Sequence, residues 1–143
     1  MSANSRFGLS GPIARRFKGA VAAAVMAGVT IAVPVVSAGS AEAATANSPA
    51  ALQKLAAKIV PANQLASFDQ IISHESGWRI NATNPSSGSY GLPQALPASK
   101  MASAGSDWRT NPSTQLRWAL KYMNGRYGSP NQAWVFWQNH HWY

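Results

Sequence analysis

The sequence contains no cysteine, and only four acidic residues stand against twelve lysines and arginines, which gives a formal net charge of +8. Without cysteine, neither a disulfide nor a thiolate-bound structural zinc can hold the fold, so the core must rely on packing. Because acids are so scarce, carboxylate chemistry can come from very few positions. After residue 44 the only candidates are Asp69, Glu75 and Asp107.

The first 44 residues have the composition of a secretory signal peptide. Four basic residues precede residue 19, an apolar run covers 19–36, and Ala41-Glu42-Ala43 matches an A-x-A cleavage site. The alternative is an uncleaved transmembrane anchor, which needs about 20 apolar residues. Because Pro34 interrupts the run and small residues follow it, we expect cleavage near Ala43 or Ala44. The sequence therefore predicts a secreted, extracellular or wall-associated bacterial protein.

The rest of the chain is predicted to be a short linker, residues 45–48, followed by a single domain, residues 49–143, which is near the common domain size. Once the four early basic residues and Glu42 are removed, eight basic residues face three acidic ones. This charge either draws the domain to anionic surfaces or only keeps it soluble. Outside a bacterium we expect wall polymers as partners, with no nucleic acid, no membrane span after cleavage, and a monomeric state.

Helix signals recur along this domain. Serine or asparagine followed by proline, which is typical of a helix start, occurs at 48–49, 111–112 and 129–130. Apolar residues at helical spacing predict helices over 49–60, 63–76, 97–104, 112–127 and 130–138. Residues 81–91 are rich in Asn, Ser, Gly and Pro, which indicates a loop or a weak β-hairpin. The predicted fold class is mainly α.

Glu75 is the only glutamate after residue 44. It extends the apolar stripe of Leu65, Phe68 and Ile72 by another step of three, in the last turn of its predicted helix, so it should face the core. Burial and the negative end of the helix dipole both disfavour an ionised carboxyl and raise its pKa. A raised pKa is what a general acid needs. The alternative is that the helix ends early and Glu75 lies in water.

The segment His74-Glu75-Ser76-Gly77-Trp78, with Ser89-Tyr90-Gly91-Leu92-Pro93-Gln94 after the loop, resembles the soluble lytic transglycosylases of the lysozyme superfamily. Those enzymes carry a Glu-Ser pair at a helix end and Gly-Leu-Met-Gln after a loop. The resemblance continues in Asn111-Pro112. Asn84–Gly88 and Trp142-Tyr143 are similar to the aggregation-promoting-factor-like branch. The resemblance implies a small lysozyme-like domain of the goose-type or transglycosylase kind, with a loop or hairpin after the catalytic helix.

The resemblance also implies roles for the matched residues. Glu75 would protonate the glycosidic oxygen between N-acetylmuramic acid and N-acetylglucosamine in peptidoglycan strands. Ser76, Tyr90, Gln94 and Gln115 would bind the substrate around it. Gln115 stands where the family usually has asparagine.

Two further departures separate the chain from the family pattern. Pro93 replaces the usual methionine and removes a backbone donor. The family's Ala-Tyr-Asn-Ala-Gly segment has no counterpart, and Trp134–Trp137 lies in that region. No role is carried over from that segment.

All six tryptophans lie between Trp78 and Trp142, where aromatic faces could stack on sugars or pack in a core. Trp118 and Tyr122 lie on the helix face away from Leu116, Leu120 and Met123, so exposure is expected and Tyr122 is a predicted substrate-binding residue. For Trp134 and Trp137 the helical spacing favours core packing. The adjacent pair His140-His141 points in opposite directions and has no further ligand nearby, so no metal and no cofactor are predicted.

One-carboxylate chemistry fits these residues better than a pair of acids. Asp69, six residues before Glu75, lies about two-thirds of a turn around the helix, and Asp107 has the pattern of a turn or cap. The predicted reaction is therefore non-hydrolytic cleavage that forms a 1,6-anhydro sugar. The alternatives are a hydrolytic muramidase on the same fold and a catalytically silent wall-binding or aggregation-promoting protein.

Overall fold

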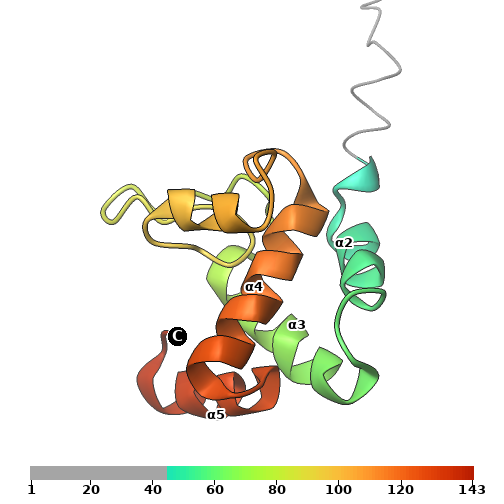
Figure 1. Ribbon diagram of the computed structural model, residues 1–143, viewed down its shortest axis with the longest axis vertical. Coiled ribbons are helices and arrows are strands. Elements are labelled where there is room, and N and C mark those ends of the chain that lie inside the picture. Colours follow the sequence, from blue (N-terminus) through green and yellow to red (C-terminus); the bar gives the residue numbers. More distant parts are fainter. Residues whose placement is uncertain (1–44) are drawn as a thin grey trace, which may run out of the picture. The chain divides into compact units, whose positions relative to one another are not determined.

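The computed structural model describes residues 45–143, so the predicted signal peptide lies outside the described residues. The helices there are α2 (Pro49–Ala56), α3 (Ala62–Ser76), the 3-10 helix η1 (Ala98–Ser103), α4 (Pro112–Tyr127) and α5 (Pro130–His140) (Figure 1). In this part of the chain, the segment predicted as a loop or a weak β-hairpin is a loop with isolated bridges between Thr83 and Tyr90 and between Tyr90 and Ala95. The mainly α prediction is confirmed. None of the helices in residues 45–143 has the length and hydropathy to cross a bilayer.

The helix ends follow the predicted signals. Ser48, Asn111 and Ser129 each accept a hydrogen bond, at 2.9–3.3 Å, from a backbone N–H two or three residues later, and a proline follows each of them. Gly77 and Gly128 end α3 and α4 with φ values of 58° and 87°. This left-handed conformation satisfies the last carbonyls without the Cβ strain of other residues. The end of α3 and both ends of α4 are therefore set by local sequence.

The first helix ends earlier than predicted. α2 stops at Ala56, and residues 57–60 continue as turns, with bonds from the Lys58 N–H to the Leu55 carbonyl and from the Ile59 N–H to the Ala56 carbonyl. Pro61 disfavours the helical conformation in the residue before it, so the chain leaves the helix ahead of α3. Ile59 nevertheless packs against the core.

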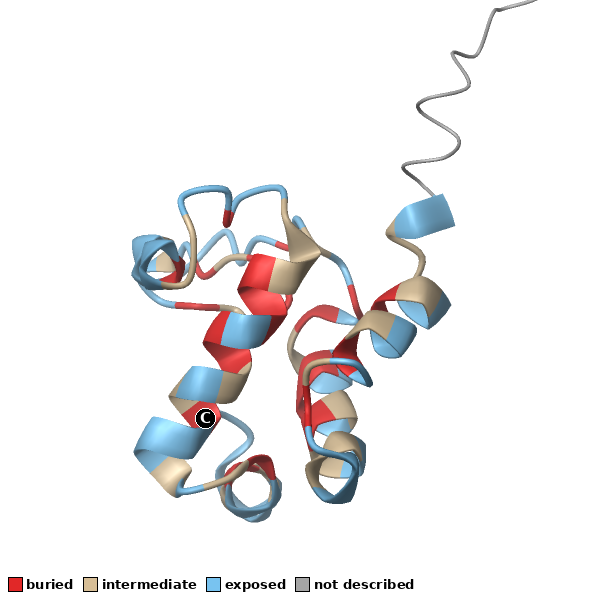
Figure 2. Cartoon of the chain, turned by 45° about the vertical axis from the view of Figure 1, so that its right-hand side comes forward, coloured by how far each residue is buried: buried red, intermediate tan, exposed pale blue. Residues whose placement is uncertain are grey.

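The main core lies where α2, α3, α4 and α5 meet, with α4 crossing the middle of this part of the chain (Figures 1 and 2). α5 packs on both α3 and α4. As a result, the C-terminal turn of α3 lies beside α5. The buried residues of the main core are Leu52, Ala56, Val60, Phe68, Ile71, Ile72, Trp78, Leu92, Leu116, Ala119, Met123 and Ala133.

A second, smaller cluster changes the prediction made for Trp118. This tryptophan is only 7% exposed and packs with Ala95, Met101 and Trp108. The expected exposure was wrong because residues 95–108 fold over that face of α4, which the helical pattern alone cannot show. Tyr122, one turn later, is partly exposed and stacks on Trp118 with ring centroids 5.1 Å apart.

Candidate functional site

Glu75 lies partly buried in the last turn of α3, with its carboxyl directed at α5. The indole Nε1 of Trp137 donates a hydrogen bond of 2.8 Å to Oε1 of Glu75. Burial raises the pKa of Glu75 above its ordinary value of 4.5, while the Trp137 bond and the nearby charge of His74 lower it. One carboxyl oxygen is thus held in place, which leaves the other available to carry a proton. The predicted inward orientation of Glu75 agrees with this geometry.

Two aromatic rings, those of His74 and Trp134, stack on Trp137 and fix its position. His74 stacks on Trp137 with centroids 4.3 Å apart and on Trp134 at 5.5 Å, and the two indoles stack at 5.2 Å. Trp134 also packs against the main core, as its spacing predicted. Because stacked aromatic rings resist reorientation, this cluster keeps the Trp137 N–H on the carboxyl of Glu75.

We expect Trp137→Phe to raise the pKa of Glu75, because the substitution keeps a ring in the cluster but removes a hydrogen bond that favours the ionised carboxylate. Carbon-13 NMR titration of the glutamate carboxyl measures this value. Trp134→Phe is the matched control, since it replaces an indole by the same smaller ring on the same helix and in the same stack. A lower or unchanged pKa in Trp137→Phe would show that the bond does not act on Glu75.

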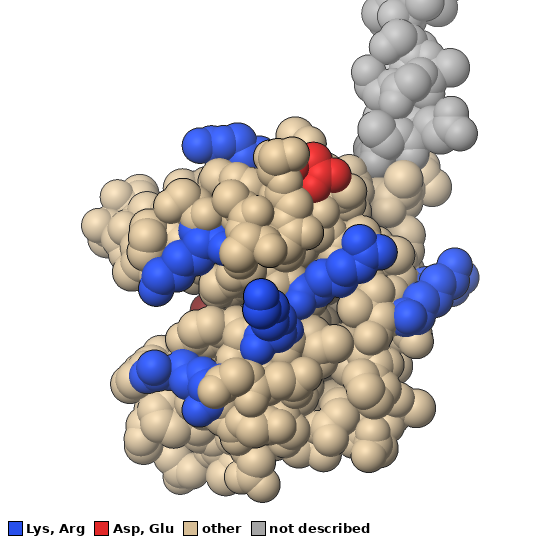
Figure 3. Space-filling view, viewed as in Figure 1, with Lys and Arg blue, Asp and Glu red and all other residues tan. Residues whose placement is uncertain are grey.

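The surface is hollowed by two cavities, of about 560 Å³ and about 100 Å³. Both are lined by Trp118 and Tyr122, and we call them together the groove. The larger cavity has a volume typical of a small-molecule site. In the space-filling view the surface is hollowed, with Lys and Arg side chains on both sides of the hollow and a small acidic patch inside it (Figure 3).

Glu75 lines neither cavity, but its charge reaches Tyr143, which lines the smaller one. The ring of Tyr143 forms part of the smaller cavity and lies edge-on to Tyr122, with centroids 5.7 Å apart. Its hydroxyl donates a hydrogen bond of 2.9 Å to the Pro93 carbonyl. Burial raises the pKa of Tyr143 well above 10, and the charge of Glu75 raises it further, so the two side chains lie within electrostatic reach.

The groove includes two of the predicted substrate-binding residues. Gln94 and Tyr122 both line the smaller cavity. Gln94 is fixed there by hydrogen bonds, because its amide donates to the carbonyls of Ala82 and Gly91 and its Oε1 accepts from the hydroxyl of Ser89. A side chain held in this way presents a fixed wall to a ligand.

The other three predicted substrate-binding residues line neither cavity: Ser76 and Gln115 are buried, and Tyr90 is partly exposed. Ser76 is 2% exposed and donates to the Ile72 carbonyl within its own helix. The hydroxyl of Tyr90 donates to the Arg109 carbonyl at 2.9 Å. Gln115 is fully buried. Direct sugar contact by Ser76 or Gln115 would require buried hydrogen bonds to break, so we assign these residues to positioning the backbone.

Gln115 joins three segments of backbone beneath the groove. Its Oε1 accepts from the Leu92 N–H at 2.8 Å, and its Nε2 donates to the carbonyls of Ile80 and Trp108 at 3.0 and 2.9 Å. Gly91 makes room for this side chain, since it has a φ of 80° and a Cβ there would lie 2.7 Å from the Gln115 Oε1. The Gly-Leu-Pro-Gln segment is therefore held against α4 by a buried amide.

Asp107 and Asp69, the other acids of residues 45–143, lie in environments separate from that of Glu75. Asp107 accepts hydrogen bonds from Asn111 and Thr114 at the start of α4, which agrees with its predicted capping role and lowers its pKa. Asp69 is partly buried, and burial raises its pKa. Neither contributes to the pKa of Glu75. In the same part of the chain, no group of three His, Cys, Asp or Glu side chains is placed to hold a metal ion.

Two residues of the site, Trp137 and Tyr143, were not predicted from the sequence. The spacing of Trp137 indicated a core position, and Tyr143 was noted only for its resemblance to the aggregation-promoting-factor-like branch. The sequence signal for Trp137 was its position in the region where the lytic transglycosylases carry the Ala-Tyr-Asn-Ala-Gly segment. Its contact with Glu75 spans 62 residues and depends on how α5 packs on α3.

The part of the chain that builds this site was compared with known families. Residues 54–139, more than half of the chain, match the family model described as the transglycosylase SLT domain. The chain belongs to this family. No curated protein and no solved structure matches it significantly. The SLT domain places the protein in the general class of peptidoglycan lytic transglycosylases and agrees with the predicted lysozyme-like fold.

Proposed function

We propose that this SLT domain acts outside the cell, after removal of residues 1–44, and cleaves the β-1,4 bond between N-acetylmuramic acid and N-acetylglucosamine. Glu75 is the single catalytic group in this proposal. The observation that carries it is a partly buried carboxyl of raised pKa that Trp137 holds by a hydrogen bond and whose charge reaches Tyr143 in the wall of the groove. No other acid of residues 45–143 contributes to this pKa. Gln94, Tyr122 and Tyr143 form the walls against which the glycan strand lies.

The reaction uses Glu75 first as an acid and then as a base. The protonated carboxyl donates its proton to the glycosidic oxygen, the bond from that oxygen to C1 breaks, and the N-acetylglucosamine leaves with a free 4-hydroxyl. The C6 hydroxyl of the muramic acid then bonds to C1, while the carboxylate takes its proton. No water is consumed, and Glu75 returns to its starting state. Both steps are efficient only if the pKa lies near the working pH, which burial favours.

Within residues 45–143, no second acid contributes to the pKa of Glu75, which supports this route over two-carboxylate hydrolysis. Retaining and inverting glycosidases place two carboxyls about 5–9.5 Å apart. Asp69 lies six residues earlier on α3, about 9 Å along the axis and on another side of the helix. Asp107 is held by its hydrogen bonds at the start of α4.

The products distinguish the candidate functions. We expect mass spectrometry of fragments released from purified peptidoglycan to show 1,6-anhydro ends, which are lighter than reducing ends by the mass of one water. Reducing ends alone would mean that water attacks C1 and that the protein is a muramidase. Binding without release of any fragment would identify a wall-binding protein with no catalytic activity.

A further inference from the structure

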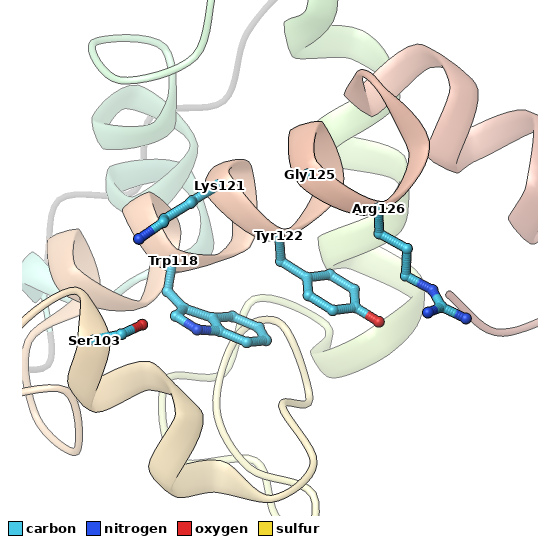
Figure 4. A pocket seen from close by; sticks show the side chains of 6 residues that line it. All are labelled: Ser103, Trp118, Lys121, Tyr122, Gly125 and Arg126. Atoms are coloured by element: carbon cyan, nitrogen blue, oxygen red, sulfur yellow. The ribbon is translucent and has the colours of Figure 1, made fainter.

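The larger cavity of the groove lies between η1 and α4 (Figure 4). Trp118 points from α4 toward η1, and Tyr122 and Arg126 extend from the same side of α4 one and two turns further on. The rings of Trp118 and Tyr122 stack at an interplanar angle of 14°, so the nearly buried Trp118 supports Tyr122, whose partly exposed ring gives the cavity its aromatic surface. Gly125, which also lines the cavity, leaves open space where a side chain would project.

The charged side chains that line the two cavities are all cations. Lys121 and Arg126 line the larger cavity, and Lys100 lines the smaller one. Within the described residues, no acid lines either cavity. Arg126 is fixed by a hydrogen bond of 3.2 Å from its Nε to the Tyr127 hydroxyl and lies 5.5 Å from that ring. An aromatic surface edged by cations fits a ligand that carries both an apolar face and an anionic group.

We propose that the larger cavity recognises a free carboxylate of the stem peptide carried by the glycan strand cleaved at Glu75. This inference rests on the proposed function. The sugars of the strand are neutral in their rings, whereas the stem peptides end in carboxylates, so only the peptides can use Lys121 and Arg126. Because both cavities share Trp118 and Tyr122, a strand in the smaller cavity extends into the larger one. The cations therefore select strands whose stem carboxylates are unmodified.

The test measures binding of full-length Glu75→Gln, which leaves the polymer uncut, to two insoluble peptidoglycans. Both are first stripped of phosphate-containing wall polymers with hydrofluoric acid, and in one of them the carboxylates are converted to methylamides. We expect the unmodified polymer to be bound about fivefold more tightly, the effect of two solvent-exposed ion pairs. Adding Lys121→Gln and Arg126→Gln should remove this preference. Adding Lys54→Gln and Lys58→Gln, which are exposed changes of equal charge on and after α2, should retain it.

Equal binding to both polymers would overturn the inference, and so would an equal loss of preference in the Lys54/Lys58 control. The same comparison is repeated with polymers that have not been treated with hydrofluoric acid. A preference seen only with these untreated polymers would identify the phosphate-containing wall polymers as the ligand instead. The proposed function is judged separately, by the fragments that the wild-type chain releases. A wild type that cuts both polymers equally would leave Glu75 as the catalytic acid and remove only the stem-peptide selection.

Discussion

Replacing Glu75 with glutamine is expected to reduce the release of soluble glycan fragments from purified peptidoglycan by about a thousandfold, the usual contribution of a general acid. Glutamine keeps the shape of the side chain, and its carbonyl oxygen still accepts the hydrogen bond from Trp137. It cannot donate the proton that the leaving 4-hydroxyl requires. Fragment release, followed by chromatography of the soluble products, measures the effect.

Thermal unfolding separates this loss from misfolding. Burial raises the pKa of Glu75 in the folded state. The protonated side chain therefore contributes fully to the free energy of unfolding below the pKa of the unfolded chain, and this contribution is lost as the pH rises through the pKa of the folded state. Glutamine has no such loss, and the melting temperature at neutral pH should be no lower than that of the wild type. Asp69→Asn removes the same charge from the same helix and should remain active. Undiminished cleavage by Glu75→Gln would exclude Glu75 as the acid.

Replacing Gln115 with leucine is expected to lower the free energy of unfolding by at least about 3 kcal/mol, since each buried polar group left without a partner costs about 1–3 kcal/mol. The substitution leaves the Leu92 N–H without its acceptor and the carbonyls of Ile80 and Trp108 without this donor. Leucine has a similar volume, so the loss reflects hydrogen bonding more than packing. Urea denaturation followed by circular dichroism gives the value.

Gln53→Leu provides the matched control. Gln53 is exposed on α2, and the same substitution there should change the stability by less than about 0.5 kcal/mol. If both variants unfolded at the same urea concentration, the buried amide would not hold the loop against α4. The role assigned to Gln115 would then return to direct contact with the substrate.

The features predicted correctly from the sequence are those that depend on neighbouring residues. Asn111 followed by proline marks the start of α4 because the cap and the restricted φ act within one turn. Gly77 marks the end of α3 because only glycine adopts its left-handed conformation without strain. The inward orientation of Glu75 followed from helical periodicity, which is also a local property.

The features that were missed depend on packing between distant segments. Trp118 was expected to be exposed, but the segment around Met101 covers it. The burial of Gln115 was not foreseen, because its amide bonds a carbonyl 35 residues away. Trp137 reaches Glu75 only because α5 packs on α3. Periodicity and capping rules describe residues within one helix, so they cannot predict these contacts between distant segments.

The most direct test of Glu75 as a protonated acid is the pKa of its carboxyl, measured by carbon-13 NMR on a chain labelled at glutamate. The chain contains only two glutamates, Glu42 and Glu75, and the Glu75→Gln variant assigns the two signals. We predict a pKa clearly above 4.5 for Glu75, caused by its burial beside Trp137. A pKa at or below 4.5 would mean that the carboxyl is ionised like an exposed side chain, which would contradict its role as the proton donor.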